Sequence, residues 1–307
     1  MSDGGAGSAA YEVRANVLIL GENALATAAA LAAVHAAGYH ADGPLDHERG
    51  SALIAEGGQR LIVLAAAAED GPALDVLLAE MDQAGAHGRC RGLVILAPDM
   101  IDRVAAAISH PAIELLCDPT PVEIAGALAL HLARPRRVAD LSGDDTRRLR
   151  DLSEEVGRIA QALASLSEET QAGQGLRERQ RGYEVEPLSY ESGMVTADDV
   201  RRLIRARRMR ARFFDSELFA DPAWDMLLDL AAARLEGGSV AVSSLCIAAA
   251  VPPTTALRWI RMMSDQGIFV RSADPMDGRR VFIGLSDRVA RAMNAYFSAV
   301  KEAGLLA

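Results

Sequence analysis

The sequence is poor in cysteine and in aromatic residues. Its 307 residues include 3 cysteines, which form no C-x-x-C motif and have no histidine cluster near them. This set argues against a disulfide scaffold or a zinc site and indicates a reducing compartment. Aromatic residues make up 4% of the chain, whereas hydrophobic residues make up 50%. We therefore expect sizeable cores built mainly from alanine, leucine, valine and isoleucine.

The sequence also lacks the segments that direct a chain to a membrane. Its first ten residues, MSDGGAGSAA, contain no basic stretch followed by an apolar one, so we expect no signal peptide. No apolar run reaches the ~18 residues of a membrane-spanning helix. These absences predict a cytoplasmic protein with no membrane partner.

Positive charge is scarce in the chain as a whole but not in its C-terminal third. The formal net charge is −10. Residues 1–135 carry 7 Arg/Lys against 17 Asp/Glu and residues 136–200 carry 9 against 14, whereas residues 201–307 carry 16 against 11. This asymmetry predicts a nucleic-acid-binding module attached to an acidic remainder.

Residues 15–135 alternate apolar runs with alanine-rich runs, after an N-terminus of residues 1–14 that we expect to be disordered. We predict strands at 15–21, near 39–41, and at 60–66, 92–97 and 112–117, and helices at 23–38, 72–85, 99–108 and 121–133. Strands that alternate with helices are typical of an α/β fold with a doubly wound parallel sheet.

Five such units in about 120 residues resemble the receiver domain of response regulators. The sequence GEN at 21–23 offers one carboxylate where that family has an acidic pair for magnesium. Three alanines, 65–67, stand where the family has its phosphate-accepting aspartate, Ala97 replaces a serine or threonine, and Asp118 replaces a lysine. The resemblance therefore implies a pseudo-receiver that is not phosphorylated and that senses a small molecule or docks a protein.

Two other functions of this region find little support. VLILGENALA has one glycine where the dinucleotide-binding fingerprint has three, which argues against a nucleotide-binding enzyme. Glu69 and Asp70 follow the third strand, and we interpret them as a solvated acidic loop and not as a metal site. We therefore expect no metal and no cofactor.

A heptad pattern occupies the helix predicted at 136–172. Its apolar residues are spaced 3, 4, 3, 4, 3, a period that favours a homodimeric coiled coil over an amphipathic helix packed on its own chain. Residues 173–195 lose the period and are expected to form a linker. The predicted seam consists of Leu149, Leu152, Val156, Ile159, Leu163 and Leu166.

The basic third, 196–307, has the predicted element order of a winged helix-turn-helix. Thr196, Asp221, Ser243 and Ser286 are expected to cap helices, and strands are predicted at 239–242, 268–272 and 279–286. The first of these helices carries four arginines on one face, which is either solvated or contacts DNA phosphates or the acidic N-terminal region. They are Arg201, Arg205, Arg208 and Arg212.

Two stretches of this third resemble the MarR family of transcriptional regulators. AAAVPPTTALR, 248–258, resembles its turn and the start of its recognition helix, with Ala250 at the family's turn glycine. DPMDGRR, 274–280, resembles its wing. The resemblance covers about 222–300 and implies an α+β winged helix-turn-helix domain that binds double-stranded DNA.

The helix at 253–266 has the two faces that a recognition helix needs. Ala256, Ile260 and Met263 are predicted to pack inward, and Trp259 is expected to pack rather than to stack on a base. On the outer face, threonines suit phosphates or bases, and an arginine can read guanine. A wing arginine suits a phosphate or the minor groove, and Asp277 is expected to pair with one. The predicted DNA contacts are Thr254, Thr255, Arg258, Arg261, Arg279 and Arg280.

These patterns together predict a homodimeric, sequence-specific transcriptional regulator associated with the nucleoid. It is not expected to be an enzyme, because none of its Ser, His or Asp residues lies in a recognisable nucleophile turn. Two alternatives stay open, namely a chromosome-organising DNA-binding protein and a winged-helix module that binds proteins.

The heptad pattern makes a prediction about assembly. If the seam is intermolecular, a fragment of residues 1–195 should dimerise, and Ile159→Asp should disrupt the dimer because each buried charge would face its own copy. Light scattering or sedimentation measures both outcomes. A wild-type fragment that stays monomeric at tens of micromolar would contradict an intermolecular seam.

Overall fold

The computed structural model describes residues 16–68, 70–133 and 195–304. The coiled coil predicted at 136–172, nearly all of the predicted linker at 173–195, and residues 1–14 lie outside the described residues. We call 16–133 the α/β part and 195–304 the winged-helix part. Residues 16–131 and 195–304 belong to one compact unit. None of the described helices is long and apolar enough to cross a membrane.

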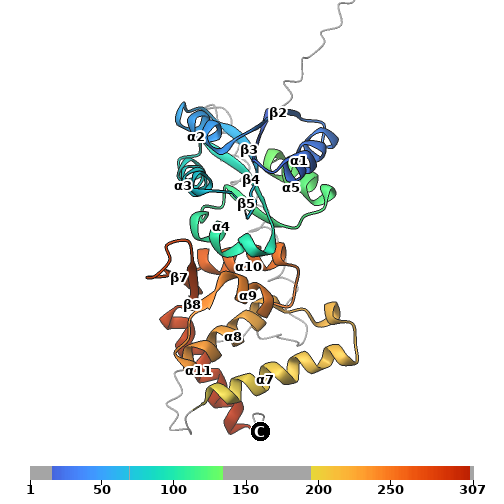
Figure 1. Cartoon of the computed structure of the whole chain (residues 1–307). Helices are drawn as coiled ribbons and strands as arrows, with labels where there is room; N and C mark the ends of the chain where they lie inside the picture. Colours follow the sequence, from blue (N-terminus) through green and yellow to red (C-terminus); the bar gives the residue numbers. More distant parts are fainter. Residues whose placement is uncertain (1–15, 69, 134–194, 305–307) are drawn as a thin grey trace, which may run out of the picture. The chain divides into compact units, whose positions relative to one another are not determined.

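The α/β part contains a five-stranded parallel sheet in the order β2-β1-β3-β4-β5. Figure 1 shows α1 and α5 on one face of this sheet and α2, α3 and α4 on the other, which is the doubly wound arrangement predicted from the sequence. Its strands are β1 (Asn16–Leu20), β2 (His40–Leu45), β3 (Arg60–Ala65), β4 (Cys90–Leu96) and β5 (Ile113–Cys117). Its helices are α1 (Ala24–Ala36), α2 (His47–Ala55), α3 (Pro72–Ala86), the 3₁₀ turn η1 (Pro98–Met100), α4 (Ile101–Ala107) and α5 (Pro121–Ala133).

Helix α2 is an element that the sequence did not predict. Its first five residues, HERGS, are polar or glycine, and Gly50 is a poor helix former. Its start is nevertheless well defined, because the Asp46 side chain accepts a hydrogen bond from the Arg49 backbone N–H at 2.7 Å. The helix buries His47, Gly50 and Ile54.

The middle of the sheet is packed so closely that one strand position admits only glycine. A Cβ atom at Gly92 in β4 would lie 1.8 Å from the carbonyl oxygen of Ile62 in β3. The central strands are apolar toward both faces because helices cover both, as in other parallel sheets. Val17, Val63 and Leu93 are fully buried there.

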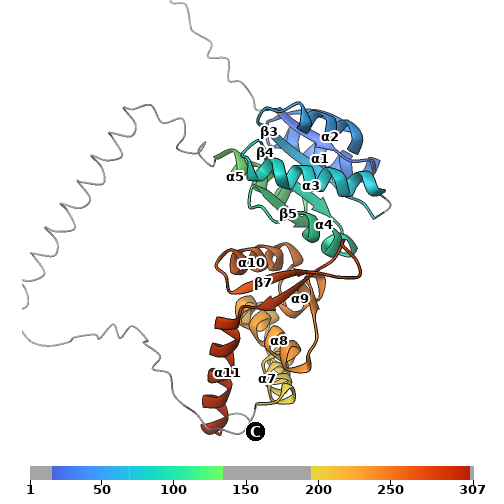
Figure 2. The ribbon, with the colours of Figure 1, turned by 90° about the vertical axis from the view of Figure 1, so that its left-hand side faces the viewer.

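The winged-helix part has a small antiparallel sheet in the order β6-β8-β7. Helices α8 and α11 lie side by side, with the ring centroids of Trp224 and Tyr296 5.0 Å apart (Figure 2). The strands are β6 (Val240–Ala241), β7 (Phe269–Ala273) and β8 (Val281–Leu285), and residues 274–280 form the wing. The helices are α7 (Ala197–Met209), α8 (Pro222–Glu236), α9 (Val242–Ala248), α10 (Pro253–Asp265) and α11 (Asp287–Glu302), with 3₁₀ turns η3 (Arg210–Arg212) and η4 (Ser216–Phe219).

The predicted helix caps are partly correct. Thr196 and Asp199 form a reciprocal capping box at the start of α7, and the Asp221 side chain accepts from the Trp224 N–H. The prediction for Ser243 is wrong, because α9 begins at Val242 and so places Ser243 inside the helix. Ser286 occupies the N-cap position of α11, but its hydroxyl makes no hydrogen bond with any described residue.

The turn between α9 and α10 holds a residue in a left-handed conformation. Ala250, at the position where the MarR family has glycine, has φ of 54°. A residue with a Cβ atom adopts this conformation at a cost of about 1–2 kcal/mol. The surrounding helices therefore stabilise the turn against a local preference.

The close approach of β3 and β4 leads to a test of stability. Gly92→Ala should lower the free energy of unfolding by at least about 2 kcal/mol, since the new methyl group would meet a backbone carbonyl and overpacking is costly. Gly126→Ala is the control, because a Cβ there meets nothing within 4 Å. In the interior of α5 it should raise stability by roughly 0.5–1 kcal/mol. Equal urea midpoints for wild type and Gly92→Ala would contradict the packing described.

Candidate nucleic-acid interface

The inner face of α10 anchors the helix in the winged-helix part as predicted. Ala256, Ile260 and Met263 are at most 3% exposed. Trp259 is half-buried and packs against the same core, which agrees with a packing role. The apolar face thus fixes the direction in which the outer face points.

The outer face of α10 contacts the edge strand β5 of the α/β part. The backbone N–H of Cys117 donates to the Thr254 hydroxyl oxygen at 2.9 Å, and that hydroxyl lies 3.2 Å from the Cys117 carbonyl. Arg261 donates to the carbonyl oxygen of Ile113. Ile113 and Cys117 lie four residues apart on β5, so their backbone groups point to the same side of the strand. That side is the edge of the sheet, which no other described strand covers. The helix therefore satisfies polar groups that an open sheet edge leaves unpaired.

Glu114 is the acidic centre of this contact. Its Oε1 accepts a hydrogen bond from Nε of Arg258 at 2.7 Å, and a second guanidinium nitrogen of Arg258 also contacts it. Its Oε2 lies 3.4 Å from Nε2 of His131 on α5. The hydrogen bond from His131, together with Arg258, holds the pKa of Glu114 below its usual value even though burial acts to raise it. Glu114 therefore stays a carboxylate and pairs with the arginine that was predicted to read DNA.

A second contact joins α4 to α9 and β7. Both oxygens of Asp102 are used, since Oδ1 accepts the Ser243 backbone N–H at 2.9 Å and Oδ2 accepts the Ser243 hydroxyl at 2.6 Å. Arg271 donates to the carbonyl oxygen of Ala105. Burial lowers the pKa of Arg271 and of Arg261, as expected for guanidinium groups removed from water. Ser243, predicted as a cap, thus serves in this contact.

The wing is the most exposed part of the predicted interface. Arg279 is 63% exposed and its Nε lies 3.6 Å from Oδ2 of Asp75 on α3, a loose pair. Asp277 accepts from the backbone N–H of Arg279 at 3.0 Å. It therefore shapes the wing through the backbone, whereas the sequence suggested an ion pair with a side chain. Arg280 is also exposed, and Thr255 is half-buried on α10.

Arginines on the basic face of α7 bind other residues of the winged-helix part. Arg201 binds Asp229 at 2.7 Å and Glu236 at 3.0 Å, and these partners raise its pKa. Arg208 donates to the carbonyl oxygen of Ala248 at 3.4 Å. Arg201 and Arg208 therefore hold helices of this part together, and neither of the two contacts is made with the acidic α/β part.

Five of the six predicted DNA contacts fall into two groups in the structure. Thr254, Arg258 and Arg261 are brought together on α10 and are occupied by β5, whereas Arg279 and Arg280 extend on the wing. The acidic partners Asp75, Asp102 and Glu114 were not singled out from the sequence. The signal that pointed toward them was the charge difference between the first 135 residues and the last 107.

A potential metal-ligand cluster lies elsewhere in the α/β part, near the ends of β1 and β3. It consists of Glu22, His47 and Asp70. Asp70 is only 6% exposed, so its interpretation as part of a solvated acidic loop is wrong. The carboxylate accepts the Ala67 N–H at 2.8 Å, which holds it inside the loop.

Comparison with known proteins finds similarity in solved structures only. A scan against protein-family models finds no match, and a search of curated proteins finds none. A probable transcriptional regulator from Pseudomonas aeruginosa is 21% identical, over 34% of this chain and 74% of that chain, with a TM-score of 0.23. S. aureus MepR in its DNA-binding conformation is 19% identical, over 36% of this chain and 81% of that chain, with a TM-score of 0.25.

A further structural neighbour was solved with a small molecule. The PcaV transcriptional regulator from Streptomyces coelicolor, in complex with its natural ligand, is 18% identical over 33% of this chain and 77% of that chain, with a TM-score of 0.21. These neighbours are MarR-family transcriptional regulators.

The lowered pKa of Glu114 leads to a pH-dependent test. Its folded-state pKa is below the unfolded value, so its contribution to stability is present above the unfolded pKa and is lost as the pH falls through the folded pKa. Glu114→Gln should therefore cost about 1 kcal/mol near pH 7, the scale of a partly exposed ion pair, and progressively less in acid. Urea denaturation across this pH range measures the difference. Glu48→Gln, exposed on α2, is the control. A cost for Glu114→Gln that does not change with pH would contradict the assignment.

Proposed function

We propose that this chain is a transcriptional regulator that binds double-stranded DNA as a homodimer through α10 and the wing. The observation that carries the proposal is the outer face of α10. It presents Thr254, Arg258 and Arg261 beside one another, while the apolar face is buried in the winged-helix part. This division is the one that a helix needs to enter the major groove.

Four of the six predicted contacts have a defined chemical role in this proposal. The guanidinium of Arg258 can donate two hydrogen bonds to O6 and N7 of guanine, and the Thr254 hydroxyl can bind a phosphate or a base edge. The wing arginines, Arg279 and Arg280, would bind phosphates or enter the minor groove, where the negative potential attracts guanidinium groups. The homodimer rests on the heptad seam, which lies outside the described residues.

We further propose that the α/β part regulates DNA binding by competing for the same residues. Arg258 cannot pair with Glu114 and with guanine at once, and Thr254 cannot bind both Cys117 and a phosphate in the same geometry. DNA would therefore have to displace β5 from α10. An effector, either a small molecule or a protein, that binds the α/β part and weakens this contact would increase the affinity for DNA.

A second candidate function is that of a protein-interaction module. It is favoured by the observation that the outer face of α10 already binds backbone groups of a strand edge, namely those of Ile113 and Cys117. A partner strand could bind the same face. DNA-binding measurements separate the two functions.

Substitution of Arg258 and substitution of its partner Glu114 should change DNA affinity in opposite directions. Arg258→Ala should weaken binding by roughly 1–3 kcal/mol through the loss of a bidentate base contact. Glu114→Gln should tighten binding severalfold, because it removes the charge that competes for Arg258. Fluorescence anisotropy of the full chain, with duplexes selected from fragmented genomic DNA, measures both.

Glu48→Gln serves as the control because it changes the formal charge equally at a distance from α10. Affinity should also fall steeply with salt, as counterion release requires. Normal binding by the double variant Arg258→Ala/Arg279→Ala would rule out DNA recognition by α10. If Arg258→Ala weakens binding while Glu114→Gln leaves it unchanged, DNA recognition stands and regulation by β5 is ruled out.

A further inference from the structure

A buried histidine at the carboxyl ends of the parallel strands has no hydrogen-bond partner. His47 is the first residue of α2 and is 0% exposed. Neither of its ring nitrogens makes a hydrogen bond with any residue that the structure describes. Buried polar side chains almost always have a partner, so this position requires a physical explanation.

Two carboxylates face the ring of His47. Nδ1 lies 3.1 Å from Oε1 of Glu22, and Nε2 lies 3.5 Å from Oδ2 of Asp70. The fold brings the three side chains together because β2, β1 and β3 are neighbours in the sheet and run parallel. Glu22, His47 and Asp70 each follow one of these strands, so all three lie at the same edge.

The three side chains offer a ligand set of one nitrogen and two oxygens. One ligand atom from each residue lies within 4.8 Å of the others. Tetrahedral ligands at ~2.1 Å from a zinc ion are roughly 3.4 Å apart, so the ligand atoms would have to move slightly closer together. The Glu22 side chain can move, since it is 51% exposed, whereas His47 and Asp70 are held in place by burial.

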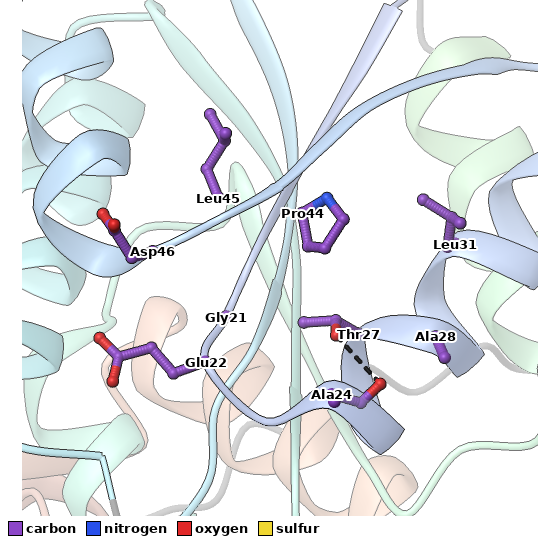
Figure 3. Close-up of a pocket in the computed structure, with 9 residues that line it drawn as sticks. All are labelled: Gly21, Glu22, Ala24, Thr27, Ala28, Leu31, Pro44, Leu45 and Asp46. Atoms are coloured by element: carbon purple, nitrogen blue, oxygen red, sulfur yellow. Dashed lines mark hydrogen bonds between the residues drawn. The ribbon is translucent and has the colours of Figure 1, made fainter.

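Space for a further ligand adjoins Glu22. A pocket of about 340 Å³ is lined in part by Gly21, Glu22, Leu45 and Asp46. Figure 3 shows the carboxylates of Glu22 and Asp46 on the same side of this pocket, with Thr27 and Leu31 on the other. A metal ion held by Glu22 would therefore be reachable by water or by a small molecule bound in the pocket. Three protein ligands with an open position are characteristic of sites that exchange a ligand.

We propose that Glu22, His47 and Asp70 bind a divalent transition-metal ion of the zinc class. The imidazole nitrogen selects against magnesium and calcium, which prefer sites made only of oxygen ligands. A dication would neutralise the two carboxylates and would bind one ring nitrogen of His47, which makes no hydrogen bond with a described residue. The competing explanation is an imidazolium ion held between the two carboxylates without a metal.

Titration of the untagged full chain with Co²⁺ and Zn²⁺, after treatment with a chelator, tests the proposal. We expect one equivalent of Co²⁺ to bind with visible absorption bands of a low-coordinate site, and Zn²⁺ to displace it. Loss of even an outer partner of a metal ligand costs about 10–100-fold in affinity, so Glu22→Gln and His47→Gln should each weaken binding by at least tenfold. Glu48→Gln, the exposed neighbour of His47, should bind as wild type does.

Substitution of a buried ligand is more disruptive to folding than substitution of an exposed one. His47 is fully buried, so His47→Gln is compared with wild type by circular dichroism, whereas Glu22 is half-exposed and its variant should fold normally. Absence of Co²⁺ and Zn²⁺ binding by wild type at millimolar concentrations would overturn the proposal in favour of the imidazolium. Binding that Glu22→Gln leaves unchanged would also overturn it, because the ion would then lie at other residues. These readouts do not involve DNA and are independent of the proposed regulator function.

Discussion

The contact between strand β5 and helix α10 is the interaction on which the described structure depends. An edge strand exposes unpaired backbone groups, and an arginine-bearing helix needs acceptors for its guanidinium groups. Thr254 and Arg261 satisfy backbone groups at Cys117 and Ile113, while Arg258 pairs with Glu114. Each side thus meets a requirement of the other, and the polar groups that would otherwise attract a foreign strand or a polyanion are covered.

This contact explains part of the charge difference between the acidic N-terminal region and the basic C-terminal third. The acidic residues of the first region are not simply a solvated surface, because Glu114 and Asp102 lie opposite basic or donor groups of the winged-helix part. A carboxylate and a nucleic acid both offer negatively charged oxygen to arginine. Competition between them needs no change in the fold of either part, only an exchange of acceptors. Under the proposed function, the same chain would carry both a nucleic-acid-binding surface and its inhibitor.

Regular elements and apolar faces were predictable from the sequence, and contacts between distant residues were not. The strands of the parallel sheet and the inward face of Ala256, Ile260 and Met263 follow from local periodicity. The wing was expected from the resemblance of residues 274–280 to the wing of the MarR family. Helix α2 was missed because its sequence is mostly polar and short. The burial of Asp70 was not predictable from its local sequence, because its neighbour His47 lies more than twenty residues earlier in the chain. The heptad seam stays a prediction.

The left-handed alanine in the turn before α10 has a mechanical consequence. A glycine at position 250 would adopt this φ at little cost, whereas alanine favours a negative φ and keeps a φ of 54° only while α9 and α10 stay packed. The geometry of the turn therefore reports on the packing of α9 against α10, and a loosening of that packing would let the turn relax.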